Sequence, residues 1–171
     1  MTIKQWIDNA IQSRLICTDY VRKLSYADTK EGLFRVICDP NGGNWIFDLE
    51  LKLKAKGLKL PKEEFKQEFK NYINGQRVME YGDETIYTSK FYMERTEDVI
   101  ADTTIVYLLD CKCKVIVPPN RYPNLVISDR SEVVVEMGEN VHVTIDTYGD
   151  AKYVFTHDEY KPITTHHDGN D

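Results

Sequence analysis

The feature that most constrains the fold is a short repeat in the second half of the chain. Between residues 103 and 155, apolar residues alternate with polar ones in six successive stretches. Polar turns separate the stretches, and each stretch starts 8 or 10 residues after the one before it. Strict alternation gives a strand one buried and one solvated face, and a fixed short period is typical of stacked coils. Two such strands make a coil of about 18–20 residues, so the repeat predicts a β-solenoid of about three coils.

The alternation also predicts which residues face the solenoid interior. The inward positions are Thr103, Ile105 and Tyr107; Cys113, Val115 and Val117; Pro123, Leu125 and Ile127; Ser131, Val133 and Val135; Val141, Val143 and Ile145; and Ala151, Tyr153 and Phe155. An antiparallel β-sandwich or meander is the alternative, because hairpins produce strands and turns at a similar spacing. Since three coils bury little apolar surface alone, we expect the first half of the chain to cap one open end. Exposed strand edges at the other end favour self-association.

The first half of the chain has the pattern of a helical module. Apolar residues recur at steps of three and four from Ile3 to Leu24, which predicts one long helix that begins at a capping box of Thr2 and Gln5. A shorter helix over 33–38 is expected to follow.

The middle of the chain carries further helix signals. Asp28 and Glu31 have capping-box spacing before the helix over 33–38. The segment 44–56 alternates like a strand, but its Leu, Lys, Glu and Ala content favours a helix, which we predict. Pro61 suits the first position of another helix, because proline needs no intrahelical partner there.

These patterns divide the chain into three parts and give the class α+β. We predict a helical module over 1–77, a β-repeat module over 78–157 and a mobile tail over 158–171. Residues 1–75 carry 13 Lys and Arg against 10 Asp and Glu, whereas residues 76–171 carry 9 against 18. The acidic second half argues against nucleic-acid binding there.

Composition and charge runs exclude several classes of protein. Seven lysines crowd the region from Lys52 to Lys70, and we interpret them as the solvated side of two helices rather than a patch for an acidic partner. No apolar run approaches the roughly 18 residues of a membrane span, and the N-terminal stretch lacks a secretory leader. With four cysteines, the chain is expected to be cytoplasmic, with reduced thiols and no membrane association.

The titratable residues show no grouping typical of a metal site. Imidazole and carboxylate ligands gather near the C-terminus, but adjacent histidines in a tail do not pre-form a site: His157, Asp158, His166, His167 and Asp168. Cys111 and Cys113 lack zinc spacing, and we predict that Cys113 is a buried structural thiol.

No catalytic grouping emerges either. Asp110, Asp129, Asp146 and Asp150 would form a carboxylate row if they were aligned along the solenoid, but Asp also suits polar turns, which is the interpretation we adopt. The glycines within 41–44 are interpreted as a turn rather than an anion-binding loop. We therefore expect no enzyme activity, no metal and no cofactor.

Two features together, one in each half of the chain, carry a resemblance to a known type of protein. The chain reads CTDY at 17–20, DTKE at 28–31 and NWIFDL at 44–49, with Cys38 between the last two, and YGDAKYVF at 148–155. These resemble uncharacterised small bacterial and phage proteins that have an N-terminal Cys/Trp helical module and a C-terminal β-solenoid of short G-N-A-x-V-x-A repeats. Here Val and Tyr replace small residues, and PPNRYPN interrupts the pattern. The resemblance implies a fold and no catalytic residues.

The function expected from these features is a non-enzymatic module for protein interaction or self-assembly, such as a phage-type accessory protein. Its partner would be a protein or another copy of the chain. Outward positions of the repeat are the candidate contacts, because an outward valine among charges has no core to fill: Glu132, Val134, Glu136, His142 and Thr144. One alternative is an acidic inhibitor of a host defence or nucleic-acid-processing complex. The other is a small hydrolase or carbohydrate-binding solenoid that uses Asp146 and Asp150.

Overall fold

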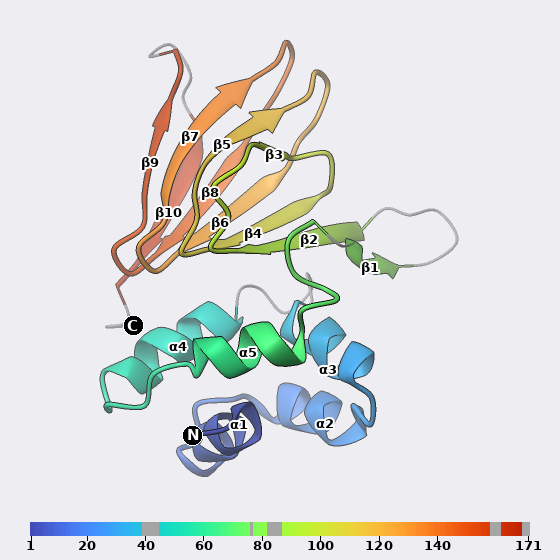
Figure 1. Cartoon of the computed structure of the whole chain (residues 1–171), viewed down its shortest axis with the longest axis vertical. Helices are drawn as coiled ribbons and strands as arrows, with labels where there is room; N and C mark the ends of the chain where they lie inside the picture. The colour runs from blue at the N-terminus through green and yellow to red at the C-terminus, as the bar shows by residue number, and fades with distance from the viewer. Residues whose placement is uncertain (39–44, 76, 82–86, 158–161, 169–171) are drawn as a thin grey trace.

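A computed structural model describes residues 1–38, 45–75, 77–81, 87–157 and 162–168 (Figure 1). In these residues, helices form one layer and two β-sheets stand above it. The helices are α1 (Ile3–Gln12), α2 (Thr18–Tyr26), α3 (Lys30–Ile37), α4 (Trp45–Lys54) and α5 (Lys62–Glu68). The strands are β1 (Arg77–Tyr81), β2 (Tyr87–Met93), β3 (Val99–Ile100), β4 (Ile105–Leu109), β5 (Lys112–Val117), β6 (Asn124–Ser128), β7 (Glu132–Met137), β8 (Thr144–Tyr148), β9 (Lys152–Phe155) and β10 (Ile163–His167).

The capping signals predict where the first helices begin, except that the cap of α3 is shifted by one residue and the long first helix is broken in two. The Thr2–Gln5 capping box is present at the start of α1. The long predicted helix is broken into α1 and α2, because Arg14 adopts a left-handed backbone with φ of 55°. Thr29 rather than Asp28 caps α3, since its hydroxyl accepts a hydrogen bond from the Gly32 N–H at 2.9 Å.

The predicted helix over 44–56 is confirmed as α4, although the turn over 39–43 and Asn44 lie outside the described residues. Gly57 follows α4 with φ of 76°, a conformation that costs glycine little. Pro61 occupies the N-cap position of α5 instead of its first helical position.

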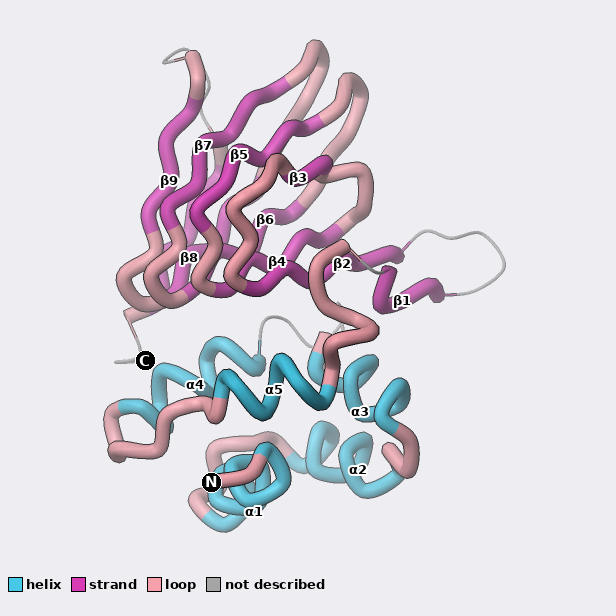
Figure 2. The backbone as a smooth tube through the Cα atoms, viewed as in Figure 1, coloured by secondary structure: helices cyan, strands magenta, loops and turns pink. Residues whose placement is uncertain are grey.

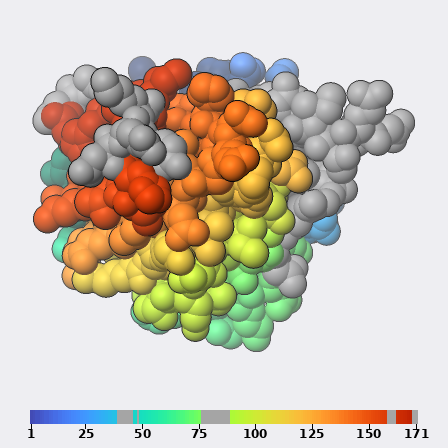
Figure 3. Space-filling model, turned by 90° about the horizontal axis from the view of Figure 1, so that it is seen from above, coloured from blue at the N-terminus to red at the C-terminus, as the bar shows by residue number. Residues whose placement is uncertain are grey.

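The second half is a two-sheet parallel β-solenoid. One sheet has the strand order β1-β2-β4-β6-β8-β10 and the other β3-β5-β7-β9. Within the second sheet, Lys112 pairs with Glu132 and Glu132 with Lys152, so one coil takes 20 residues. The parallel ladders favour the solenoid over the antiparallel alternative. Short loops join the sheets (Figure 2), and successive coils lie side by side in chain order when seen from the side opposite the helices (Figure 3).

Each coil turns toward the second sheet at one residue with a left-handed backbone. Glu94, Asp110, Asp129 and Gly149 follow four strands that are paired in register, and their φ angles are 52°, 53°, 58° and 67°. Asp and Gly tolerate this conformation better than most residues, because Asp can hydrogen-bond locally and Gly has no Cβ. The recurrence of these residues therefore fixes the position of one corner of the solenoid.

The solenoid interior matches the predicted inward positions except in the first copy. The interior includes Leu125 and Ile127 as predicted, but Val106 and Leu108 replace the expected Ile105 and Tyr107. All five residues of β4 are buried. A strand covered on both faces has no polar face, so its alternation cannot reveal which side points inward.

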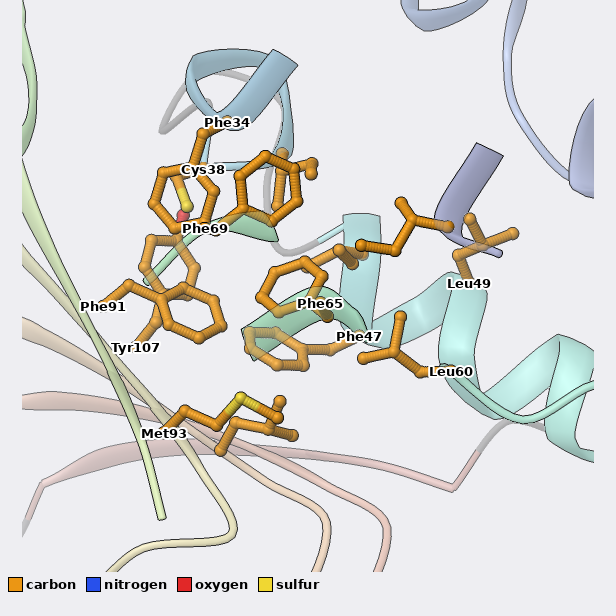
Figure 4. Packing of buried hydrophobic residues seen from close by; sticks show 14 of the residues in the cluster. Phe34, Cys38, Phe47, Leu49, Leu60, Phe65, Phe69, Phe91, Met93 and Tyr107 are labelled. Carbon is orange, nitrogen blue, oxygen red and sulfur yellow. The ribbon is translucent and has the colours of Figure 1, made fainter. Parts of the chain in front are cut away.

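An aromatic cluster joins the helices to the outward face of the six-stranded sheet (Figure 4). The Phe91 ring in β2 lies 6.2 Å from Phe47 in α4, 5.7 Å from Phe65 in α5 and 5.8 Å from Tyr107 in β4. Phe34 in α3 is also within 5.7 Å of Phe91. The helices thus cover one side of the solenoid, and the expectation that they cap its end is wrong. The cause is the outward aromatic residues of β2 and β4, which supply a face to bury.

The two ends of the solenoid differ. At the first end, β1 runs antiparallel to β2 and occupies the edge of the six-stranded sheet. At the other end, β9 and β10 are the last strands of their sheets. The stretch 158–171, expected to be a mobile tail, contains β10, which pairs in parallel with β8 from Ile163 to His167. An edge strand can form on backbone hydrogen bonds, so it needs no apolar pattern in its sequence.

Candidate functional site

The predicted contact residues lie on more than one surface. Glu132, Val134 and Glu136 point outward from β7, in the middle of the four-stranded sheet. His142 lies in the turn between β7 and β8, where its ring stacks on Tyr122 at a centroid distance of 5.7 Å. Thr144 begins β8 in the other sheet. The structure therefore brings three of the five residues together.

These three residues belong to the outward face of the four-stranded sheet, which we call the open face. Figure 1 shows the helices on the far side of the six-stranded sheet, and no described helix or strand covers the open face. The outward side chains of β3, β5, β7 and β9 form it: Ile100, Lys112, Lys114, Ile116, Glu132, Val134, Glu136, Lys152 and Val154.

Strand register arranges charges of both signs on the open face. Lys112, Glu132 and Lys152 form one row, and Lys112 Nζ lies 3.2 Å from Glu132 Oε1. Lys114 Nζ lies 3.2 Å from Glu136 Oε2 on the diagonal and 3.7 Å from Asp98 Oδ2. Exposed pairs of this kind contribute little stability. They nevertheless set an alternating charge pattern that a partner surface can match.

An apolar strip crosses the open face between these charges. Val134 and Val154, which are neighbours in register, form this strip and are 38% and 59% exposed. Ile100, which is 53% exposed, lies apart from them as the register neighbour of Ile116 in β5. Apolar side chains exposed together among charged ones are typical of interaction sites. The sequence pattern identified Val134 and Val154 as outward but missed Ile100, because β3 is too short to show alternation.

A shallow depression of about 670 Å³ lies on the open face. Lys112, Lys114, Glu132, Val134 and Val154 line it, together with Thr96 and other residues of the same strands. The depression thus combines the apolar strip with both signs of charge, which suits a protein surface better than a uniformly charged ligand.

A second group of charged residues lies where the helices meet the solenoid corner. Lys62 of α5 donates hydrogen bonds to the carboxylates of Asp110 and Asp129. Lys54 Nζ of α4 lies 3.8 Å from Asp129 Oδ1, and Lys66 of α5 pairs with Glu94. We call this group the corner clamp. The interpretation of the Lys52–Lys70 run as a solvated face is wrong for Lys62, whereas Lys54 and Lys66 remain exposed to solvent while they pair with carboxylates of the solenoid.

The corner clamp sets the protonation of two carboxyl groups. Burial alone raises the pKa of Asp110, but the hydrogen bond and charge of Lys62 outweigh it, so its pKa lies below the ordinary value. Glu50 of α4 is buried, and that burial raises its pKa despite the nearby charges of Lys62 and Lys54. A cavity of about 420 Å³ adjoins these residues. The geometry holds α4 and α5 onto the corner.

The four aspartates considered as a carboxylate row do not form one. Asp110 and Asp129 lie together in the corner clamp. Asp146 on β8 instead accepts a hydrogen bond from Asn124 Nδ2 at 3.0 Å, on the side of the sheet that faces the helices. Asp150 follows Gly149 at the corner and is exposed. Turn chemistry does explain Asp110 and Asp129, which occupy the left-handed corner positions.

Two cysteines and two C-terminal histidines make structural contacts. Cys111 and Cys113 are buried, as predicted for Cys113. Their mutual hydrogen bond raises the pKa of Cys111, which burial raises further, and lowers that of Cys113. His166 Nδ1 lies 2.8 Å from Thr147 Oγ1, and His167 stacks on Tyr148.

Over the described ranges, no three His, Cys, Asp or Glu side chains are grouped to hold a metal ion. The 41–44 turn and Asp158 lie outside these ranges. None of the helices in the described part of the chain combines the length and the apolar run that crossing a membrane requires. Comparison with protein-family models, curated proteins and solved structures finds no match.

Proposed function

We propose that this chain is a cytoplasmic, non-enzymatic protein-interaction module that binds a protein partner through the open face. One observation carries the proposal. The helices bury the outward face of one sheet, whereas no described element covers the outward face of the other, which displays Val134 and Val154 beside the charged row of Lys112, Glu132 and Lys152.

The chemistry of the open face defines the partner. Burying an exposed valine contributes on the order of 1–2 kcal/mol, so the apolar strip supplies part of the binding free energy. Lys112, Lys152 and Glu132 select a surface with complementary charges and disfavour like charges. The partner is therefore a protein with a small apolar centre and charges of both signs.

The other two functions have less support. An acidic inhibitor needs an exposed row of carboxylates, but Asp110 and Asp129 are engaged by Lys62. A hydrolase needs two carboxyl groups on one cleft, whereas Asp146 lies on the helix-facing side of β8 and Asp150 at the exposed corner. The open face remains the surface that the geometry favours.

Comparative affinity capture from the cells that produce the protein tests the proposal. Val134→Glu places a charge in the apolar strip, and Tyr26→Glu places the same charge at a 78% exposed residue of α2 as a matched control. We expect wild type and Tyr26→Glu to capture the same set of proteins, and we expect Val134→Glu to lose that set. A capture set that Val134→Glu retains in full would overturn the proposal, as would wild-type capture no different from the tag alone.

A further inference from the structure

We propose that two copies of this chain associate through the last coils of their solenoids, with β9 pairing antiparallel with β9 of the second copy and β10 with β10. This end contact uses a different surface from the open face. Its success or failure is therefore independent of the proposed function.

The peptide groups of β9 alternate between β7 and the end of the solenoid. The Lys152 N–H donates to the Ser131 carbonyl at 2.8 Å and the Thr156 N–H to the Val135 carbonyl at 3.0 Å. In a parallel ladder, the peptide groups of alternate residues point to opposite sides. The N–H and C=O of Tyr153 therefore point away from β7, toward the end of the four-stranded sheet.

The same alternation applies to β10. The Gly149 N–H donates to the His167 carbonyl at 3.3 Å, so the odd-numbered residues of β10 face β8. The peptide groups of Thr164 and His166 point the other way. Both sheets thus present backbone donors and acceptors at one end of the molecule, which is the template that another strand pairs with.

The side chains of the last coil are incompletely buried at this end. Val133 and Val135 of β7 are 2% and 0% exposed, whereas Tyr153 and Phe155, their register neighbours in β9, are only half-buried. In β10, Thr164 and His166 are the register neighbours of Ile145 and Thr147, the inward residues of β8, but both are exposed. A further layer on this end would complete the burial of Tyr153 and Phe155, and burial of apolar surface stabilises association.

A second copy fits this end better than a single peptide does. A peptide adds to one strand edge, whereas the end presents the edges of two sheets at a fixed separation. The last coil of another copy has the same two edges at the same separation. The first end of a copy cannot take this place, because β1 runs antiparallel along β2 there.

Twofold symmetry follows from using the same end of both copies. The rotation reverses the strand direction, so β9 meets β9 in an antiparallel pair and the assembly closes as a dimer. If Tyr153 lies on the axis, Lys152 of one copy faces Val154 of the other. No like charges then meet along β9, which removes an electrostatic penalty from the contact.

Sedimentation of the full chain over a concentration series tests the proposal. We expect a dimer for wild type and at least about tenfold weaker association for Tyr153→Lys, because an inward lysine on an edge strand blocks pairing. Val134→Lys is the matched control, since it adds the same charge to the open face on β7, one strand in from the end contact, and should leave the dimer intact. Circular dichroism establishes that each variant is folded.

A second variant decides the case if Tyr153→Lys does not fold. Thr164→Pro removes an N–H that β8 does not use, so the variant should fold and lose the dimer. Monomeric wild type at all concentrations would overturn the proposal, and so would oligomers that keep growing, because a twofold contact closes. A dimer that survives both Tyr153→Lys and Thr164→Pro but not Val134→Lys would move the contact to the open face and overturn it as well.

Discussion

Lys62 of α5 donates a hydrogen bond to the carboxylate of Asp129, 67 residues further along the chain. It also pairs with Asp110, which stands one coil earlier at the same corner. The excess of basic residues in the first half and of acidic residues in the second is therefore partly satisfied within the molecule. The charge asymmetry of the sequence therefore arises partly from ion pairs between the two halves and partly from their solvent-facing surfaces.

Replacement of Lys62 by methionine should destabilise the fold. The Asp110 and Asp129 side chains are only 10% and 11% exposed. The variant would leave them with longer ion pairs alone, Arg130 at 3.6 Å from Asp110 and Lys54 at 3.8 Å from Asp129. We expect a loss of about 3 kcal/mol in the free energy of unfolding, measured by urea denaturation. Lys30→Met removes the exposed pair with Glu68 and should cost about 0.5 kcal/mol. Equal losses in the two variants would contradict the corner clamp.

Glu50→Gln should stabilise the protein at neutral pH by about 1 kcal/mol. Burial raises the pKa of Glu50 in the folded chain. The stability that its protonated form contributes is therefore fully present below the unfolded pKa and is lost as the pH rises through the folded pKa. The advantage of Glu50→Gln should vanish below the ordinary carboxyl pKa of about 4.3.

Urea denaturation at a series of pH values measures this difference. Glu31→Gln, at an exposed residue paired with Arg35, is the control and should show only a small change at each pH. A Glu50→Gln variant that is less stable than wild type at pH 7 would mean that the cations of the corner clamp outweigh burial.

The corner residues and the corner clamp show which features the sequence can predict. Asp110, Asp129 and Gly149 recur at spacings of 19 and 20 residues directly after apolar strands, a turn signal visible in the sequence. Nothing near Lys62 indicates its partners, because the contact depends on how the helices dock. Local patterns therefore predict the solenoid corner, and only the folded chain brings the lysines to it.

Gly138→Ala should destabilise the turn that follows β7 and leads back to the six-stranded sheet. A Cβ at this position would lie 2.8 Å from the Pro119 nitrogen and 2.9 Å from its Cδ, so the two coils would have to separate. We expect a cost of about 2 kcal/mol in thermal or urea unfolding. Gly57→Ala is the matched control, since its Cβ would meet nothing within 4 Å and only its backbone conformation is strained, at about 1 kcal/mol. A larger loss for Gly57→Ala than for Gly138→Ala would contradict this stacking.

Phe91→Ala should weaken the helices and the solenoid together. The Phe91 ring contacts aromatic rings from α3, α4 and α5 and from β4, so its removal leaves a cavity between the layers and costs about 4 kcal/mol. Both tryptophans lie in the first half of the chain, so their fluorescence reports on the helices while circular dichroism reports on the whole chain. We expect both signals to change in one transition, in wild type and in Phe91→Ala. Separate transitions would show that the layers fold independently.

The same cluster explains the limits of the sequence analysis for the fold. Alternation in β5 to β8 predicts the inward residues because the other face of each strand carries polar side chains, although Val126 in β6 and Tyr148 in β8 also lie on that face, buried against the helices. In β4, Ile105 and Tyr107 are as apolar as Val106 and Leu108, since the helices cover the other face. The repeat therefore predicts the solenoid, whereas the side that the helices occupy depends on aromatic residues outside the repeat, such as Phe91. That choice of side also determines which face stays open.

Site-specific photo-crosslinking from position 134 tests the proposed function most directly. A photoreactive residue that replaces Val134 reports what lies against the centre of the open face in the producing cells, and the same residue at position 26 on α2 is the control. The account predicts a discrete adduct with another protein from position 134 and none from position 26. No adduct from position 134, or the same adducts from both positions, would contradict binding through the open face.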